Sequence, residues 1–167
     1  MDMEKLIQRA KEREPEAFTH LMDLHMQGMY KTARAILQND EDAADAIQDT
    51  ILICWEKLSG LKENRYFKTW ITRILINRCN EMLRKKKETA ILEEMPEAAA
   101  VESEYDMEWK EALEAISEEY RLPVILYYGQ GFHTKEIAAM LGITDAAVRT
   151  RLARARGQLR KYYREEE

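Results

Sequence analysis

The side chains with the clearest chemical potential lie in residues 134–156, which read TKEIAAMLGITDAAVRTRLARAR. The second half of this stretch is rich in arginine, whose guanidinium group donates paired hydrogen bonds to guanine edges and to phosphates. A helix that carries these groups on one face can enter the major groove of DNA. The polar side chains expected on that face are Arg149, Thr150, Arg151, Arg154 and Arg156.

Two short helices joined by a glycine turn must position these arginines. Thr134 suits the N-cap of the first helix, Gly142 supplies the left-handed residue that ends it, and Thr144 starts the second. Apolar side chains that we expect to be buried recur at helical spacing: Ile137, Ala138 and Leu141, then Val148, Leu152, Ala155 and Leu159. The pattern predicts a helix-turn-helix. The alternative is an ordinary helical hairpin with a solvated basic face.

The net charge of −5 conceals two basic segments. Residues 65–87 hold eight basic side chains and one acidic, a net charge of +7. Residues 145–164 hold seven basic and one acidic, a net charge of +6. Between them, residues 88–119 hold twelve acidic side chains and one basic, a net charge of −11. Because a polyanion responds to the local field, the two basic segments predict two contacts on one nucleic acid.

The composition indicates an all-α chain of one or two small domains. Ala, Leu, Glu, Lys, Arg and Met favour helices, and the chain has only six glycines and three prolines. Cys54 and Cys79 have no metal-ligand spacing, so we expect a reducing, cytoplasmic compartment. The charged start of the chain argues against a signal peptide, and no apolar run is long enough to span a bilayer. Direct membrane insertion is therefore not expected.

Residues 1–87 read as a bundle, with helices expected over 3–13, 15–39, 41–58 and 66–87. Asn39 is expected to end the second helix and Asp40 to cap the third. His25 is expected to pack at the edge of the second helix's buried stripe rather than to act in catalysis or metal binding. The side chains expected to be buried are Phe18, Leu21, Met29, Ala33 and Ile36, then Ala43, Ala44, Ile47, Ile51, Cys54 and Leu58, then Phe67, Trp70, Ile71, Ile74, Leu75 and Met82.

Residues 88–105 break the helical pattern. This stretch is rich in alanine and glutamate and contains Pro96, which predicts a flexible or extended linker. Helical periodicity resumes at Asp106, so a second domain is expected over residues 106–167.

The two halves together resemble a known family. The runs DAADAIQDTILICWEKL and FKTWITRILINRCNEMLRKKK are similar to region 2 of the bacterial extracytoplasmic-function (ECF) sigma factors, and residues 106–163 resemble their region 4. The resemblance implies two helical domains, region 2 over residues 1–87 and region 4 over 106–167, joined by a linker over 88–105. It implies an initiation factor that binds core RNA polymerase, at the clamp and the flap, and promoter DNA.

The resemblance also implies roles for particular residues. In the family, the acidic amphipathic helix of region 2 docks on the polymerase clamp, and the matching positions here are Asp45, Gln48, Asp49 and Leu52. Carboxylates and an amide beside an exposed leucine suit a partner helix that bears arginines. A solvated acidic face is the alternative reading of this strip.

The loop before the fourth helix and the helix itself resemble the element that reads and opens the −10 part of a promoter. Melting requires a cationic track for one strand and a pocket for an unstacked base. The matching positions are Lys62, Asn64, Arg65, Tyr66, Asn77, Arg78, Asn80 and Arg84. Trp70 is expected in the core rather than as a stacking platform, whereas both readings stay open for Tyr66.

In region 4 the resemblance implies recognition of the −35 element. Arg149, Thr150, Ala153 and Arg154 are expected to face the bases, and Arg151 and Arg156 the phosphates. ECF sigma factors are commonly held inactive by an anti-sigma protein, so such a partner is expected as well.

Two other classes of function are less consistent with the sequence. A dimeric DNA-binding regulator requires a dimerisation or ligand-binding domain, and no heptad seam or pocket signature is visible in the N-terminal half. A hydrolase or transferase requires a phosphate loop, paired catalytic carboxylates with a histidine, or a metal cluster, and none can be assembled. No catalytic residue, cofactor or metal is therefore expected.

Overall fold

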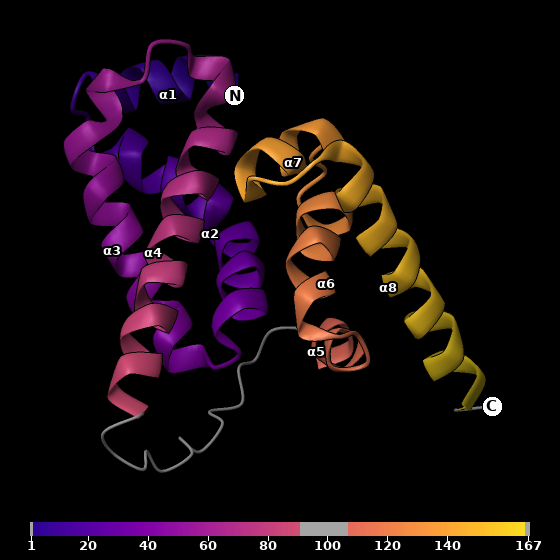
Figure 1. Cartoon of the computed structure of the whole chain (residues 1–167). Helices are drawn as coiled ribbons and strands as arrows, with labels where there is room; N and C mark the ends of the chain where they lie inside the picture. The colour runs from indigo at the N-terminus through magenta and orange to yellow at the C-terminus, as the bar shows by residue number, and fades with distance from the viewer. Residues whose placement is uncertain (1, 91–106, 166–167) are drawn as a thin grey trace. The chain divides into compact units, whose positions relative to one another are not determined.

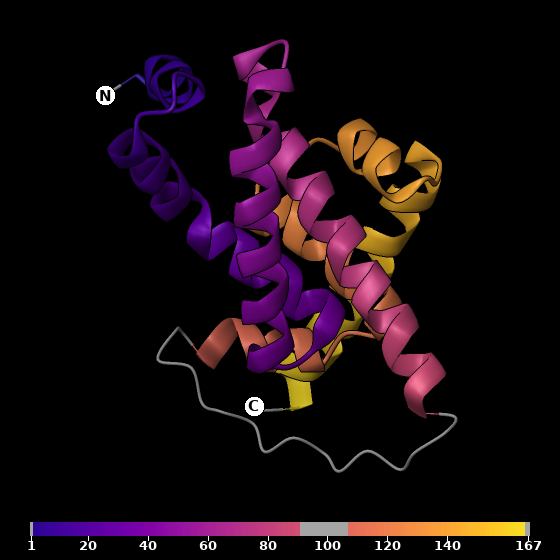
Figure 2. The same ribbon diagram turned by 90° about the vertical axis from the view of Figure 1, so that its left-hand side faces the viewer.

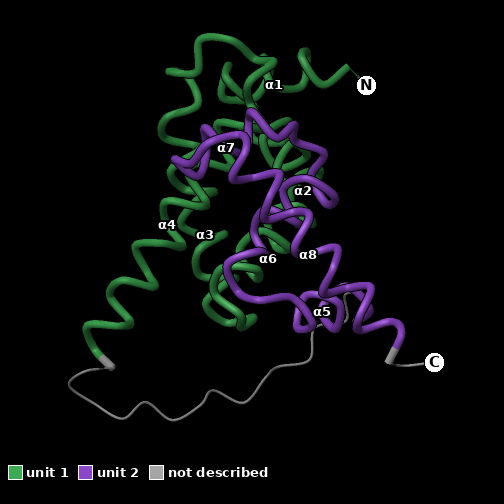
Figure 3. The backbone as a smooth tube through the Cα atoms, turned by 45° about the vertical axis from the view of Figure 1, so that its right-hand side comes forward, with its two compact units in different colours: residues 1–100 green, residues 101–167 purple. Residues whose placement is uncertain are grey.

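The computed structural model describes residues 2–90 and 107–165, and every element assigned within them is helical. The chain divides into two compact units, residues 1–100 and 101–167 (Figure 3). In the first unit the elements are α1 (Met3–Lys11), α2 (Pro15–Leu37), α3 (Asp40–Lys57), η1 (Leu58–Gly60), η2 (Asn64–Tyr66) and α4 (Phe67–Ala90). In the second they are α5 (Met107–Glu114), α6 (Glu118–Val124), η3 (Ile125–Gly129), α7 (Thr134–Leu141) and α8 (Asp145–Glu165).

In the first unit α2, α3 and α4 pack against one another, and the short α1 packs on α2 beside the turns that follow α3 (Figures 1 and 2). The core between them is built from large apolar side chains such as Leu21, Phe67 and Leu75, each at most 1% exposed. Phe18 and Trp55 pack edge to face with their ring centroids 4.9 Å apart. Burial of these faces, more than helix propensity, holds the bundle together.

The second unit contains the predicted helix-turn-helix. α7 and α8 pack against each other, and α6 packs along α8 (Figure 1). Gly142 ends α7 with a left-handed φ of 68°, as its type predicts. The expected burial of Ile137, Ala138, Val148, Leu152 and Ala155 is confirmed, whereas Leu141 and Leu159 lie only half-buried at the edge of the small core.

Helix ends depart from the predictions by one to three residues. Gln38, with φ 64°, ends α2, and Asn39 caps α3 by accepting a hydrogen bond from the backbone N of Asp42 at 2.8 Å. The roles predicted for Asn39 and Asp40 are therefore shifted by one position. Thr134 is also not the N-cap of α7, because His133 holds that position and its backbone N donates to the Glu136 carboxylate at 3.1 Å.

Two further differences concern α3 and α4. Ala44, expected in the core, is exposed, and Ala46 is fully buried instead. α4 ends at Ala90 rather than at residue 87, so residues 88–90 are helical, and the remainder of the predicted linker lies outside the described residues. Cys54 and Cys79 are both free and buried among the helices of the first unit.

Candidate functional site

The exposed face of α8 carries the cationic side chains predicted to contact DNA. The Thr144 hydroxyl caps the helix by accepting from the backbone N of Ala147 at 3.0 Å. Val148, Leu152 and Ala155 anchor the opposite face, each at most 2% exposed. Thr150, Ala153 and Arg154 are exposed, as are Arg149 and Arg156, while Arg151 is half-buried.

Two of these arginines already have partners within the unit. Arg149 pairs with Asp145 one helical turn earlier, at 3.0 Å, although the Arg149 side chain remains 67% exposed. Arg156 donates to the hydroxyl of Tyr128 at 3.0 Å. Within the described part of the second unit Arg154 has no such contact, and its side chain is exposed. We therefore expect Arg154 to meet a ligand at lower cost than Arg149, which must first leave a carboxylate.

One face of α3 presents the predicted polymerase-docking strip. Asp45 and Gln48 are exposed, and Leu52 is 60% exposed although it is a large apolar side chain. Ala44 extends the apolar part of this strip, because it faces solvent rather than the core. A single exposed leucine is common on protein surfaces and does not by itself mark an interface.

Asp49, the fourth residue predicted for docking, is bound to the neighbouring helix. Its carboxylate accepts a hydrogen bond from Nε of Arg78 at 2.6 Å, and Arg78 Nη1 lies 3.4 Å from Glu81. Arg78 was expected on the exposed side of α4, but its side chain is only 25% exposed and lies against α3. The hydrogen bond that Arg78 donates to Asp49 is the main cause that raises the pKa of Arg78. Arg78, predicted to contact DNA, thus binds the helix that is predicted to dock on polymerase.

The exposed strip of α4 is longer than predicted. Asn77, Asn80 and Arg84 are exposed at helical spacing. Arg73 lies one turn before Asn77, is also exposed, and was missed, although its spacing alone could have identified it. At the end of the helix, Lys86 pairs with Asp42 at 2.5 Å. Its charge is therefore already partnered within the first unit.

The loop before α4 borders a surface hollow of about 490 Å³ whose other wall is α1. The Asn64 amide donates to Oε1 of Gln8 at 3.3 Å, while its own oxygen is buried without a hydrogen-bond partner. The Lys11 ammonium donates to the carbonyl of Leu61 and holds the loop on α1. Sequence reasoning missed the contribution of α1, because Gln8 and Asn64 are 56 positions apart.

The remaining loop residues are solvent-facing. Lys62 is exposed, Arg65 pairs with Glu63 at 2.7 Å, and the Arg65 guanidinium lies 4.8 Å from the ring centroid of Tyr66. Tyr66 is 53% exposed, and because Arg65 lies over one face of its ring, a base could stack only on the other face.

Trp70 and His25 take the structural roles expected of them. Trp70 is half-buried against the core, with its ring centroid 6.0 Å from that of Phe67. His25 also packs edge to face on Phe67, and its Nδ1 lies 2.9 Å from the carbonyl oxygen of Leu21. Burial of the ring lowers the pKa of His25 below its ordinary value.

Neither a metal cluster nor a membrane span is visible in the described ranges. Within residues 2–90 and 107–165, no three acidic, cysteine or histidine side chains converge as metal ligands. None of the described helices combines the length and apolar content needed to cross a bilayer.

Comparison with known proteins identifies the chain. The family model described as Sigma-70 region 2 matches residues 21–89, and the model described as Sigma-70, region 4 matches residues 106–159. The ECF RNA polymerase sigma factor SigM of Mycobacterium tuberculosis is 31% identical over 147 residues, which cover 86% of this chain and 75% of SigM. The chain belongs to the ECF sigma factors of the sigma-70 family. The ECF sigma factor SigW of Bacillus subtilis, 26% identical over 184 residues, matches this sigma factor over 99% of its length and 98% of SigW's.

Solved structures share the fold of this sigma factor. It resembles CnrH, solved in complex with the cytosolic domain of CnrY, with a TM-score of 0.69, 24% identity and 99% of each chain covered. It also resembles RpoE of Bartonella quintana, solved with the anti-sigma factor NepR, with a TM-score of 0.76 and 24% identity over 90% of this chain and 98% of RpoE.

Membership of the family decides between the classes of function considered above. Sigma factors bind core RNA polymerase and promoter DNA and direct the initiation of transcription, and they form a non-enzymatic class. The matches to both regions exclude a dimeric repressor built on an isolated helix-turn-helix.

Proposed function

We propose that this sigma factor uses three separate surfaces, one on each of α3, α4 and α8, to bring core polymerase to a promoter and open it. The observation that carries this assignment is that the exposed faces of the three helices differ in charge. α3 is polar and acidic with one exposed leucine, whereas α4 and α8 are cationic and lie in different units. Two cationic helices in separately packed units suit two promoter elements.

The docking surface on α3 comprises Asp45, Gln48 and Leu52, with Asp49 at its margin. Asp45 offers the sharpest test because it is exposed and makes no ion pair within the described part of the chain. We expect Asp45→Arg to weaken binding to core polymerase at least about tenfold, since like charges placed opposite a basic partner cost several kcal/mol. The matched control is Asp23→Arg, which reverses an exposed charge on α2. If both variants lost the same affinity for core polymerase, α3 would not form the interface.

The −10 surface is proposed to combine the exposed strip of α4 with the loop before it. Arg73, Asn77, Asn80 and Arg84 form a track along which one strand can run. The exposed side chain of Tyr66 offers a stacking platform to an unstacked base, and Asn64 lies beside it in the same turn. Arg78 is proposed here to hold α3 against α4 rather than to contact DNA, because its guanidinium is already shared by two carboxylates.

The −35 surface is proposed to be the exposed face of α8. Arg154 and Arg149 are positioned to bond base edges beside Thr150 and Ala153, and Arg151 and Arg156 to reach phosphates. The tight turn at Gly142 sets the angle at which α8 leaves α7, as in other helix-turn-helix proteins.

Run-off transcription tests the whole assignment. Core polymerase is mixed with the purified sigma factor and a library of genomic fragments, and the start sites are sequenced. We expect starts to share two sequence elements at a fixed separation, and core polymerase alone to give none of them. Starts that share no element would contradict the proposal.

We propose in addition that a separate anti-sigma protein holds this sigma factor inactive. The support is that RpoE, which has the same fold, was solved with the anti-sigma factor NepR, and that CnrH was solved with the cytosolic domain of CnrY. The purified protein should then be active in vitro without any effector, while its promoters remain silent in growing cells. Promoters equally active in cells and in vitro would argue against such a partner.

A further inference from the structure

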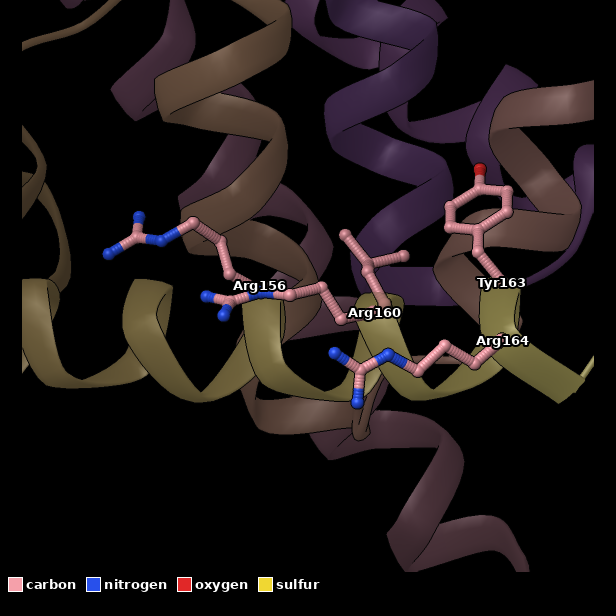
Figure 4. A pocket seen from close by; sticks show the side chains of 5 residues that line it. Arg156, Arg160, Tyr163 and Arg164 are labelled. Carbon is pink, nitrogen blue, oxygen red and sulfur yellow. The ribbon is translucent and has the colours of Figure 1, made fainter.

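The last two turns of α8 carry an arginine stripe that the assigned surfaces do not include. Arg156, Arg160 and Arg164 lie one helical turn apart, and with Leu159 and Tyr163 they line an open groove of about 430 Å³. Figure 4 shows the three guanidinium groups extending from the same side of α8, with Tyr163 turned away from them. Arg156 belongs both to this stripe and to the −35 surface.

Arg156 bonds the hydroxyl of Tyr128, but among the described residues nothing in the packing of the second unit requires Arg160 or Arg164. Beyond Ala155 no described side chain of α8 is fully buried. In the described part of the chain neither Arg160 nor Arg164 makes an ion pair. Like charges one turn apart destabilise a helix, so three arginines in line oppose folding rather than assist it. The helix dipole favours a cation in the last turn, which accounts for Arg164 but not for Arg160.

The end of α8 is nevertheless held in a defined direction. Oε1 of Gln158 accepts from the backbone N of Ser117 at 2.9 Å, and its Nε2 donates to the Ser117 hydroxyl at 2.8 Å. This reciprocal pair fastens α8 to the junction of α5 and α6. The arginines that follow are therefore presented by a helix with a fixed axis.

Helical geometry places the stripe outside the groove that the start of α8 would enter. Arg149, Ala153, Arg156, Arg160 and Arg164 are separated by four, three, four and four residues, so they follow one line along the helix. At about 1.5 Å per residue, Arg160 and Arg164 lie roughly 16 and 22 Å beyond Arg149. A major groove is only about 12 Å wide. A helix that reads bases near Arg149 thus carries Arg160 and Arg164 past the groove wall, where the phosphate backbone lies.

We propose that Arg160 and Arg164 bind backbone phosphates of the promoter duplex beside the −35 element and extend its contact without reading sequence. The proposal rests on the −35 surface assigned to α8. Guanidinium groups match phosphate oxygens in a paired geometry, and their charge complements the backbone. Tyr163, which is 56% exposed, lines the same groove.

The salt dependence of promoter binding tests this assignment. Holoenzyme reconstituted from core polymerase and the full-length chain, wild type or carrying Arg160→Gln or Arg164→Gln, is titrated onto a promoter found by run-off transcription. Each lost phosphate contact lowers the slope of log affinity against log salt by about 0.9, so wild type should lose roughly threefold more affinity than either variant between about 50 and 200 mM salt. The matched control is Lys57→Gln, an exposed cation in the last turn of α3 that belongs to none of the assigned surfaces, which should keep the wild-type slope.

Three results would overturn the inference. If both arginine variants kept the wild-type salt slope, neither arginine would bind a backbone phosphate. If the variants kept the wild-type salt slope on the promoter but bound polyglutamate more weakly than wild type, the stripe would be assigned to an acidic polypeptide partner. If the arginine variants changed the salt slope on the promoter but not on DNA with an altered −35 element, the arginines would read bases instead. Failure of the wild-type holoenzyme itself to bind would contradict the proposed function as well, and this outcome is recognised without any variant.

Discussion

At the scale of single residues, the arginines of α8 differ in how free they are. Arg149 is committed to Asp145, whereas Arg154 is exposed without a partner in the second unit as described. A surface ion pair between neighbouring helix turns contributes only about 0.3–0.5 kcal/mol, so DNA can displace it at a modest cost. The two positions therefore differ in degree rather than in kind.

We expect Arg154→Ala to cost about 1–3 kcal/mol in binding the preferred −35 sequence and to relax the preference at one base pair. Arg149→Ala should reduce the binding free energy by less, because Arg149 must break its ion pair with Asp145 before it can bind DNA. Affinities of both variants for all single-base changes of the element provide the measurement. An equal loss on every sequence would assign Arg154 to phosphates.

Two residues other than glycine adopt left-handed backbone conformations within residues 2–90 and 107–165, namely Arg13 with φ 68° and Gln38 with φ 64°. Gln38→Gly should stabilise the protein by about 0.5–1 kcal/mol, because glycine adopts this conformation without strain at the end of a helix. Urea unfolding gives the measurement.

Arg13→Gly is the informative comparison for that substitution. Arg13 donates to the carbonyl of Trp55, and its guanidinium lies 4.7 Å from the Trp55 ring centroid. Removing these contacts should cancel the gain from relieved strain, so Arg13→Gly is expected to be neutral or destabilising. Stabilisation by both substitutions would show that the contacts of Arg13 contribute little.

At the scale of elements, ion pairs tie α3 to α4 at two levels, Asp49 with Arg78 and Asp42 with Lys86. Burial alone would raise the pKa of Asp42, but hydrogen bonds from Asn39 and Lys86 outweigh it and hold the pKa below 3.8. A carboxyl group with a lowered pKa in the folded state stabilises the fold above its unfolded pKa. That contribution is lost as the pH falls through the folded pKa.

Lys86→Met should therefore destabilise the protein by about 0.5 kcal/mol near neutral pH, the usual size for a partly exposed pair. The difference from wild type should shrink below pH 3.8 and vanish once Asp42 is protonated. Urea unfolding of both proteins across this range is the measurement. Lys87→Met, at the exposed next position, serves as the control, and a difference that persists in acid would contradict the pairing.

The elements themselves were predictable from spacing, but several contacts were not. Apolar periodicity identified the helices, yet it could not separate Ala44 from Ala46, because alanine carries too little hydrophobic area to mark a face. The cap of α7 was misplaced by one residue because the capping group is the Glu136 side chain rather than that of Thr134. The bond between Asp49 and Arg78 joins positions 29 apart, and no local spacing rule predicts such a pair.

At the scale of the whole molecule, the two units have separate cores of unequal size. Small domains bury a lower fraction of their surface and are correspondingly marginal. The two cysteines both lie in the larger core, where burial raises the pKa of Cys54 and Cys79 to about 12. Thiol reactivity therefore reports the opening of the first unit alone.

We expect the second unit to unfold first in urea, with helicity lost while both thiols stay protected from a thiol reagent. Far-UV circular dichroism and the rate of thiol modification are measured on the same samples. Thiols that react in step with the first loss of helicity would show that the units unfold together, and a Cys54→Ala variant checks that the remaining thiol behaves in the same way.

The bridge between Asp49 and Arg78 has a consequence for genetics. It connects the helix assigned to polymerase to the helix assigned to the −10 element, so an altered side chain at position 49 shifts a neighbour of the melted strand. Genetic selections that restore expression from a promoter with a damaged −10 element should then yield suppressor mutations at Asp49 in α3, although no contact between this residue and DNA is proposed.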